Sequence, residues 1–227
     1  MRIEFLVEDI SGSVLIQEIM KKYNWQLETE GKVSVEYNIK PYKGIGVIKK
    51  TKDAKLCKSQ QLLSELPKRL RALQYQYIEY PEFAVFIVLD NDKRITDSFY
   101  DELKAVAESN GIKMDYVFCI AVEEMEAWLL GDYNAILTAY PNIKDRIITK
   151  YPNYQQDSIC DTWEMLADML TPKGFNSFKK DNNTVYDIGK KKTEWAMTIG
   201  SHMDIRNNRS PSFQHFVEEL DKRVLYT

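Results

Sequence analysis

The segment that constrains this chain most is Phe83–Leu89 (FAVFIVL), seven apolar residues in a row followed directly by acidic ones. A continuous apolar run of this length is typical of a strand buried on both faces of a parallel sheet. Apolar segments at Arg2–Val7 and Asp115–Val122 predict two more strands. The alternating segment Val33–Ile39 predicts a fourth, half-exposed strand.

Helical patterns lie between these strands. Their signals are a cap at Ser11 or Ser13, a helix from about Ser59 to Leu73, a cap at Thr96 or Asp97, and a closing residue at Gly111. Strands that alternate with helices predict an α/β fold, an open and mainly parallel sheet flanked by helices with right-handed crossovers.

Beyond about Leu130 the pattern changes, and no further strand is predicted. The periodic segments are Tyr133–Ala139, Ile159–Leu170, Thr193–Gly200 and Pro211–Val224, with a polar loop at Asn176–Asn183. We therefore expect an α/β core over residues 1–130 and a helical C-terminal extension over residues 131–227, packed on that core.

Composition and charge exclude several classes of protein. The 31 basic and 34 acidic residues give a net charge of −3, so a nucleic-acid site must be local. No apolar stretch reaches the roughly 18 residues of a membrane helix, and acids occur within the first ten residues, so we expect no membrane partner and a cytoplasmic location. Three widely spaced cysteines make a disulfide framework or a zinc site improbable.

Carboxylates follow three of the predicted strands. The acids are Glu8, Asp90, Asp92, Glu123, Glu124 and Glu126. The carboxyl ends of parallel strands share one edge of a sheet, and hard carboxylate oxygens are the ligands that Mg²⁺ prefers. If the extended conformation persists, Asp90 and Asp92 also point the same way. The sequence therefore predicts a Mg²⁺ or Mn²⁺ site, although strand-end acids are also common turn formers and helix caps.

Several motifs resemble known families. VEDISGS, VLDND and AVEEMEAWLLGD resemble the acidic motifs of Toprim domains, the metal-dependent fold of topoisomerases, primases and overcoming-lysogenization-defect nucleases. With YKGIG, LLSELPKRLRAL, AYPNI and SHMDIRNNRSPSF, in order along the chain, the protein is identified as a member of the bacterial family called domain of unknown function 4276.

This resemblance implies a Toprim-like sheet and a metal-dependent nuclease that hydrolyses phosphodiester bonds of DNA or RNA. It also implies a partner ATPase of the ABC or AAA type in anti-phage defence. Glu8 matches the first Toprim acid, Asp90 and Asp92 match the paired aspartates, and Glu126 opens the E-x-W-L-L signature. One position departs from the pattern: the related nucleases often carry a second acid four residues after the first, where this chain has Gly12.

The C-terminal motif SHMDIRNNRSPSF supplies three more candidates. His202 is a candidate catalytic residue. Arg206 and Arg209 are candidates for contact with nucleic-acid phosphates, because a guanidinium is always charged and can donate two parallel hydrogen bonds to phosphate oxygens. The structural alternative is that Ser210 and Pro211 simply start the last helix.

The segment from Lys40 to Lys58 is basic and contains glycines. We interpret it as a nucleic-acid-binding loop, with Lys43, Gly44, Lys49 and Lys50 near the backbone phosphates. The alternative is a solvated charged surface. Its GIG triplet lacks the Gly-Lys-Ser/Thr ending of a P-loop, so ATP hydrolysis would have to come from the partner.

Two functions remain open from the sequence. In the first, Glu8, Asp90, Asp92 and an acid among Glu123, Glu124 and Glu126 hold Mg²⁺ or Mn²⁺ in a nuclease, and Glu8 serves as general base. In the second, a noncatalytic Toprim-like module uses the same surface to bind nucleic acid or the partner ATPase. Gly12 and the mild net charge favour the second.

Overall fold

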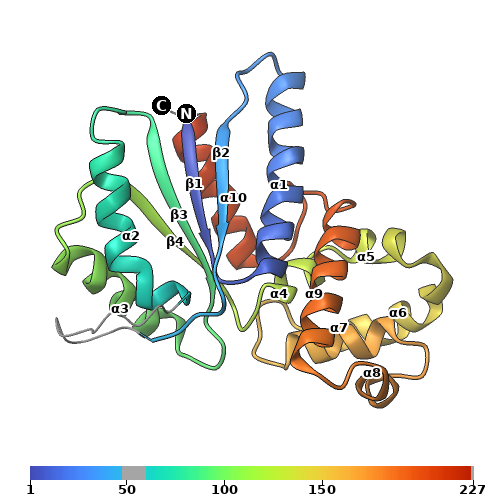
Figure 1. Cartoon of the computed structure of the whole chain (residues 1–227). Helices are drawn as coiled ribbons and strands as arrows, with labels where there is room; N and C mark the ends of the chain where they lie inside the picture. The colour runs from blue at the N-terminus through green and yellow to red at the C-terminus, as the bar shows by residue number, and fades with distance from the viewer. Residues whose placement is uncertain (48–59, 226–227) are drawn as a thin grey trace.

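The computed structural model describes residues 1–47 and 60–225. Its four strands form one parallel sheet in the order β2-β1-β3-β4 (Figure 1). They are β1 (Arg2–Val7), β2 (Glu36–Pro41), β3 (Phe83–Asp90) and β4 (Asp115–Ala121). The seven apolar residues of β3 are all buried, as expected for a central strand. The predicted α/β class with an open parallel sheet flanked by helices is therefore confirmed.

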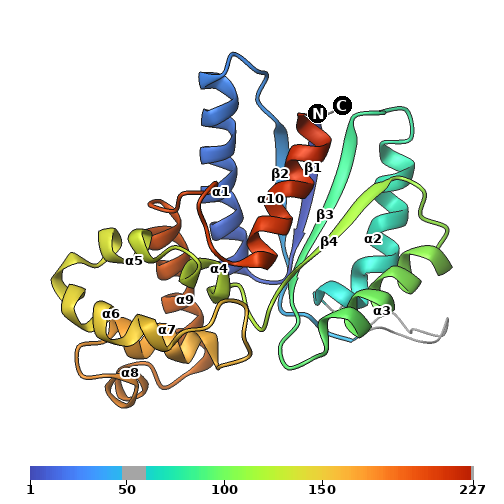
Figure 2. The same cartoon turned by 180° about the vertical axis from the view of Figure 1, so that it is seen from behind.

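Helices cover both faces of the sheet. On one face lie α1 (Ile10–Thr29) and α10 (Pro211–Val224), and on the other lie α2 (Leu62–Gln76) and α3 (Thr96–Ser109), as Figures 1 and 2 show. The last helix thus returns to the sheet. The Phe216 ring centroid lies 6.2 Å from that of Phe5 on β1 and 5.8 Å from that of Phe86 on β3.

A group of helices lies beyond the carboxyl ends of the strands (Figure 2). They are α4 (Glu126–Leu130), α5 (Tyr133–Ala139), α6 (Lys144–Lys150), α7 (Thr162–Leu170), α8 (Phe175–Asp181) and α9 (Val185–Gly200), with short 3-10 turns at Pro141–Ile143 and Tyr151–Asn153. The longest of them, α9, packs along α1. This arrangement brings α9 to the edge of the sheet where the acids lie.

Several helix and strand boundaries differ from those predicted from the sequence. The predicted polar loop at Asn176–Asn183 is wrong, because α8 occupies most of it and buries Phe178 against Trp195, with ring centroids 5.6 Å apart. Strand β2 begins three residues later than expected, since Val33 is 86% exposed. The predicted start of α2 at Ser59 lies outside the described residues.

Helix caps also differ from those expected. Asp9 caps α1, rather than Ser11 or Ser13, because its carboxylate accepts hydrogen bonds from the backbone N–H of Gly12 and the hydroxyl of Ser11, each at 2.7 Å. Neither Thr96 nor Asp97 caps α3, which is preceded by Ile95. The predicted start of the last helix is confirmed: Ser210 accepts from the N–H of Phe213 at 3.2 Å, and Pro211 occupies the first turn.

No helix in the described part of the chain is long and apolar enough to cross a bilayer.

Candidate functional site

Glu8 and Asp90 meet at the carboxyl ends of the two central strands. The backbone N–H of Asp90 donates a hydrogen bond to Glu8 Oε2 at 3.0 Å, so the two side chains lie at the same edge, as the sequence predicted. Asp90 Oδ1 is buried and accepts no hydrogen bond from any described residue. An acceptor in that state is costly unless a donor or a cation reaches it.

Lys192, on α9, reaches the same group of acids from the helical part. Its Nζ lies 3.2 Å from Glu126 Oε2 and 3.5 Å from Glu124 Oε2. The Lys192 side chain is 15% exposed and that of Glu126 only 3%. A cation from a distant helix therefore holds two of the acids that follow β4.

Lys192 is not among the predicted site residues, although the sequence carries a signal for it. Lys192, Trp195, Ala196 and Ile199 follow the spacing i, i+3, i+4, i+7, and the last three are the buried residues of α9 at these positions. Lys192 thus occupies the buried side of the helix, unlike the adjacent Lys191. A lysine on an apolar helix stripe requires a carboxylate partner when it is buried.

Burial dominates the electrostatics of the carboxyl groups. It raises the pKa of Glu8 to about 7, with repulsion from Asp92 and Asp9 adding to the effect and the hydrogen bond from Asp90 and the charge of Lys192 opposing it. Burial and the neighbouring Glu8 likewise raise the pKa of Asp90 well above its ordinary value.

The acids around Lys192 behave in the same way. Burial raises the pKa of Glu124 to about 7 and also raises the pKa of Glu126, while Lys192 opposes both shifts. Burial alone would lower the pKa of Lys192, but Glu126, Glu124, Asp90 and Asp9 together raise it. The lysine therefore stays protonated at neutral pH. Five acids (Glu8, Asp9, Asp90, Glu124 and Glu126) act on a single buried cation.

Glu123 has a different environment from that predicted for a metal ligand. Its carboxylate accepts hydrogen bonds from the backbone N–H groups of Cys160, Asp161 and Thr162, at 3.2, 2.9 and 2.8 Å. These donors precede or begin α7, where a carboxylate is favoured by the helix dipole. Glu123 is 4% exposed, and its oxygens therefore fasten the start of α7 to the end of β4.

The extended backbone conformation does not continue from Asp90 to Asp92. The strand ends at Asp90, and Asp92 adopts a left-handed conformation with φ 49°, so the expectation that both side chains face one point is wrong. The exposed carboxylate of Asp92 forms an ion pair with Arg94 at 2.7 Å. Its charge still raises the pKa of Glu8.

The steric environment of Gly12 explains the absence of an acid there. A Cβ at this position would lie 2.9 Å from Val7 Cγ1 and 3.2 Å from Asp9 Oδ1, so any side chain would force its neighbours to move. Asp9 lies near the site, since its charge affects both Glu8 and Lys192, but its oxygens already cap α1.

Two candidates from the C-terminal motif lie away from this edge. The Arg206 guanidinium pairs with Asp221 at 2.6 Å and donates to Gln26 Oε1 at 2.9 Å. Gln26 is 16 residues along α1 from Ile10, or about 24 Å at the helical rise of 1.5 Å per residue. His202 is exposed in the turn after α9, about 12 Å of helix beyond Lys192.

The structure describes Arg209 and part of the basic segment. The Arg209 side chain is exposed, and its backbone N–H donates to the carbonyl of Gly131 at 2.9 Å. The backbone N–H of Gly44, at φ 85°, donates to the Glu8 carbonyl at 3.0 Å, so the chain after β2 passes beside Glu8. Lys43 is exposed next to it. Lys49 and Lys50 lie outside the described residues.

The donor set determines which ion this edge suits. Within residues 1–47 and 60–225, no three His, Cys, Asp or Glu side chains are grouped to hold a metal ion. Mg²⁺, however, is usually bound by one or two carboxylates, with water and substrate phosphates completing its shell. Glu8 and Asp90 match this coordination pattern, since they supply two carboxylates and Asp90 Oδ1 has no hydrogen-bond partner among the described residues.

The fold and this edge define a parallel-sheet α/β protein with an acidic site at the carboxyl ends of its central strands. The chain belongs to the family described as Domain of unknown function (DUF4276), whose model matches residues 7–221. No curated protein and no solved structure matches the chain. The family predicted from the sequence motifs is therefore confirmed.

The raised carboxyl pKa values predict how stability depends on pH. Glu8 and Glu124 have folded-state pKa values of about 7 against an ordinary 4.5, so between these pH values the folded protein binds more protons than the unfolded chain. Their contribution is present at low pH and is lost as pH rises through 7, on the order of 1–3 kcal/mol for each. In EDTA, urea unfolding from pH 5 to 8 should show the Glu8→Gln variant gaining stability over wild type as pH rises. Parallel pH profiles for the two proteins would contradict this.

Proposed function

We propose that this protein is a divalent-metal-dependent phosphodiesterase with a Toprim-like sheet, and that it cleaves nucleic acid at the edge formed by Glu8 and Asp90. The observation that carries the proposal is the buried Asp90 Oδ1, which has no hydrogen-bond partner among the described residues and lies beside Glu8 in a group of acids that one lysine cannot neutralise. A divalent cation relieves such repulsion.

The residues of this edge would divide the work. Glu8 and Asp90 would hold Mg²⁺ or Mn²⁺, and the bound ion would activate water and neutralise the developing phosphate charge. Lys192, protonated at neutral pH, holds Glu124 and Glu126 and keeps α9 against the site. Glu8 exchanges a proton near pH 7 in the metal-free protein, in the range that suits general acid–base chemistry.

The resemblance to Toprim nucleases extends the proposal to a biological setting. The protein would be the effector partner of an ABC- or AAA-type ATPase in anti-phage defence, in the cytoplasm. ATP hydrolysis would have to come from that partner, because the Gly44-Ile45-Gly46 triplet of this chain lacks the lysine and hydroxyl residue of a P-loop.

A second candidate is a noncatalytic Toprim-like module that binds nucleic acid or the ATPase. The observation that favours it is the environment of Glu124 and Glu126, which Lys192 already neutralises in part, together with the lack of a three-ligand metal group in the part of the chain that the structure describes. In this case the acids would be a structural remnant.

Metal binding separates the two candidates. Calorimetric titration of the EDTA-treated protein should give saturable binding of Mn²⁺, and the melting temperature should rise in millimolar Mn²⁺ or Mg²⁺. Binding to the folded state alone stabilises it by about 2.7 kcal/mol at a hundred times the Kd. Cleavage of plasmid DNA and transfer RNA, with and without the partner ATPase, tests the reaction. No binding heat and an unchanged melting curve would leave the noncatalytic module.

A further inference from the structure

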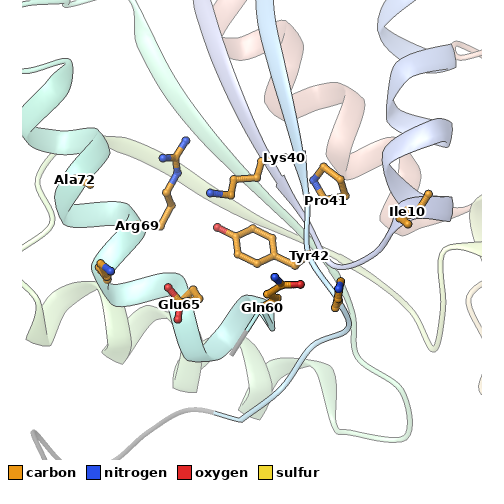
Figure 3. Close-up of a pocket in the computed structure, with 10 residues that line it drawn as sticks. Ile10, Lys40, Pro41, Tyr42, Gln60, Glu65, Arg69 and Ala72 are labelled. Carbon is orange, nitrogen blue, oxygen red and sulfur yellow. The ribbon is translucent and has the colours of Figure 1, made fainter. Parts of the chain in front are cut away.

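Beside the segment that carries Glu8, the surface has a recess lined by residues that the acidic site does not use. It is a pocket of about 540 Å³ between the end of β2 and α2 (Figure 3). Its lining consists of Ile10, Lys40, Pro41, Tyr42, Lys43, Gln60, Glu65, Lys68, Arg69 and Ala72. This volume lies in the range of small-molecule sites, roughly 300–1,000 Å³.

The pocket is basic. Lys40, Lys43 and Lys68 form no ion pair with any residue that the structure describes, and Glu65 is the one acid in the lining. The fourth cation, Arg69, forms an ion pair with the buried Glu4, and Arg69 Nη2 lies 2.5 Å from Glu4 Oε1. Three ammonium groups around one recess, with no ion-pair partner in the part of the chain that the structure describes, favour an anionic ligand.

Tyr42 adds a fixed polar group to this lining. It is only 6% exposed, yet its hydroxyl has no hydrogen-bond partner among the described residues, and neither does the buried Nε of Arg69. Lys40 and Tyr42 both project from the end of β2 toward α2, and the Lys40 ammonium lies 5.6 Å from the centre of the Tyr42 ring (Figure 3). A buried hydroxyl is normally paired, so a ligand oxygen is the natural acceptor here.

We propose that this pocket binds a nucleotide through its phosphate group. Phosphate oxygens accept hydrogen bonds from lysine, arginine and tyrosine, and charge strengthens these bonds. A phosphate alone would leave most of the volume unfilled, whereas a nucleoside fills it and contacts the apolar lining of Ile10, Pro41 and Ala72. The ligand is either a free nucleotide or the phosphorylated end of a strand.

The position of the pocket links it to the acidic edge. Lys43 in its lining precedes Gly44, whose N–H donates to the Glu8 carbonyl at 3.0 Å, and Ile10 follows Asp9 directly. The pocket therefore lies beside the chain segment that carries Glu8 and Asp9. This inference rests on the proposed function in taking nucleic acid as the substrate class, and it adds a subsite for a nucleotide, either free or at the end of a strand.

Calorimetry in EDTA tests the pocket without involving metal chemistry at the acidic edge. The probes are adenosine 5′-monophosphate, adenosine, inorganic phosphate, and six-residue oligothymidylates with and without a 5′-phosphate. We expect the monophosphate to bind more tightly than adenosine or phosphate. Tyr42→Phe should weaken its binding about tenfold by removing one hydrogen bond, and Lys68→Gln should weaken it several-fold. Lys144→Gln, an exposed lysine of α6, is the matched control and should bind as wild type does.

The two sources of the ligand give different results within the proposal. Preference for the 5′-phosphorylated oligothymidylate identifies a strand end, and binding of the monophosphate alone identifies a free nucleotide. The inference is overturned if no probe binds saturably, or if Tyr42→Phe and Lys68→Gln bind as tightly as Lys144→Gln. Metal-dependent cleavage measured on the same variants reports on the acidic edge separately, so failure of one proposal is distinguishable from failure of the other.

Discussion

Lys192→Met is expected to lower the free energy of unfolding at pH 8 by about 3–5 kcal/mol, because it leaves buried carboxylates without their cation. For a chain of this size that corresponds to a fall of roughly 10 °C in melting temperature. The affected groups are Glu126, 3% exposed, and Glu124, which lie 3.2 and 3.5 Å from the lysine. Thermal and urea unfolding in EDTA measure the effect.

The neighbouring lysine provides a matched control. Lys191 pairs with Glu194 at 2.7 Å, and both side chains are well exposed, so Lys191→Met should cost less than about 1 kcal/mol. The cost of Lys192→Met should also shrink at pH 5, where Glu124, with a pKa of about 7, takes up a proton and no longer needs the cation. Equal losses from the two variants at pH 8 would show that Lys192 is no more than a surface charge.

The part of the site that the sequence predicted follows from topology alone. The apolar run Phe83–Leu89 requires a strand buried on both faces, and such strands belong to parallel sheets whose carboxyl ends share an edge. Residues at the carboxyl ends of two neighbouring strands must then meet, as Glu8 and Asp90 do. No side-chain detail is needed for that prediction.

The part that the sequence missed depends on packing between distant elements. Lys192 is 66 residues from Glu126, and the packing of α9 along α1 and against α4 brings it to the strand ends. Glu123 and Asp92 follow strands as Glu8 does, but both adopt left-handed backbone conformations, with φ of 64° and 49°. The Glu123 side chain therefore turns toward the start of α7, and the Asp92 side chain turns toward Arg94.

Asp90→Asn is expected to abolish metal binding while leaving the metal-free fold as stable as wild type or slightly more stable. The substitution keeps the shape of the side chain and removes a group whose charged form is disfavoured in the metal-free protein, because burial and the repulsion from Glu8 raise the pKa of Asp90. The rise in melting temperature with Mn²⁺ should disappear. Metal-dependent cleavage should fall by roughly a hundredfold or more if Asp90 holds the ion.

Asp92→Asn is the matched control, and it tests whether the position of the substituted carboxylate matters. It makes the same chemical change two residues away, at an exposed side chain paired with Arg94, and asparagine tolerates the left-handed conformation. We expect its stability to lie within about 1 kcal/mol of wild type and its cleavage to fall only several-fold, since the Asp92 charge acts on the site through Glu8. If both variants bind Mn²⁺ as tightly as wild type, the ion is not held at Asp90. If Asp92→Asn instead loses binding as completely as Asp90→Asn does, both side chains are needed to hold the ion, and Asp92 is a ligand rather than a charge that acts through Glu8.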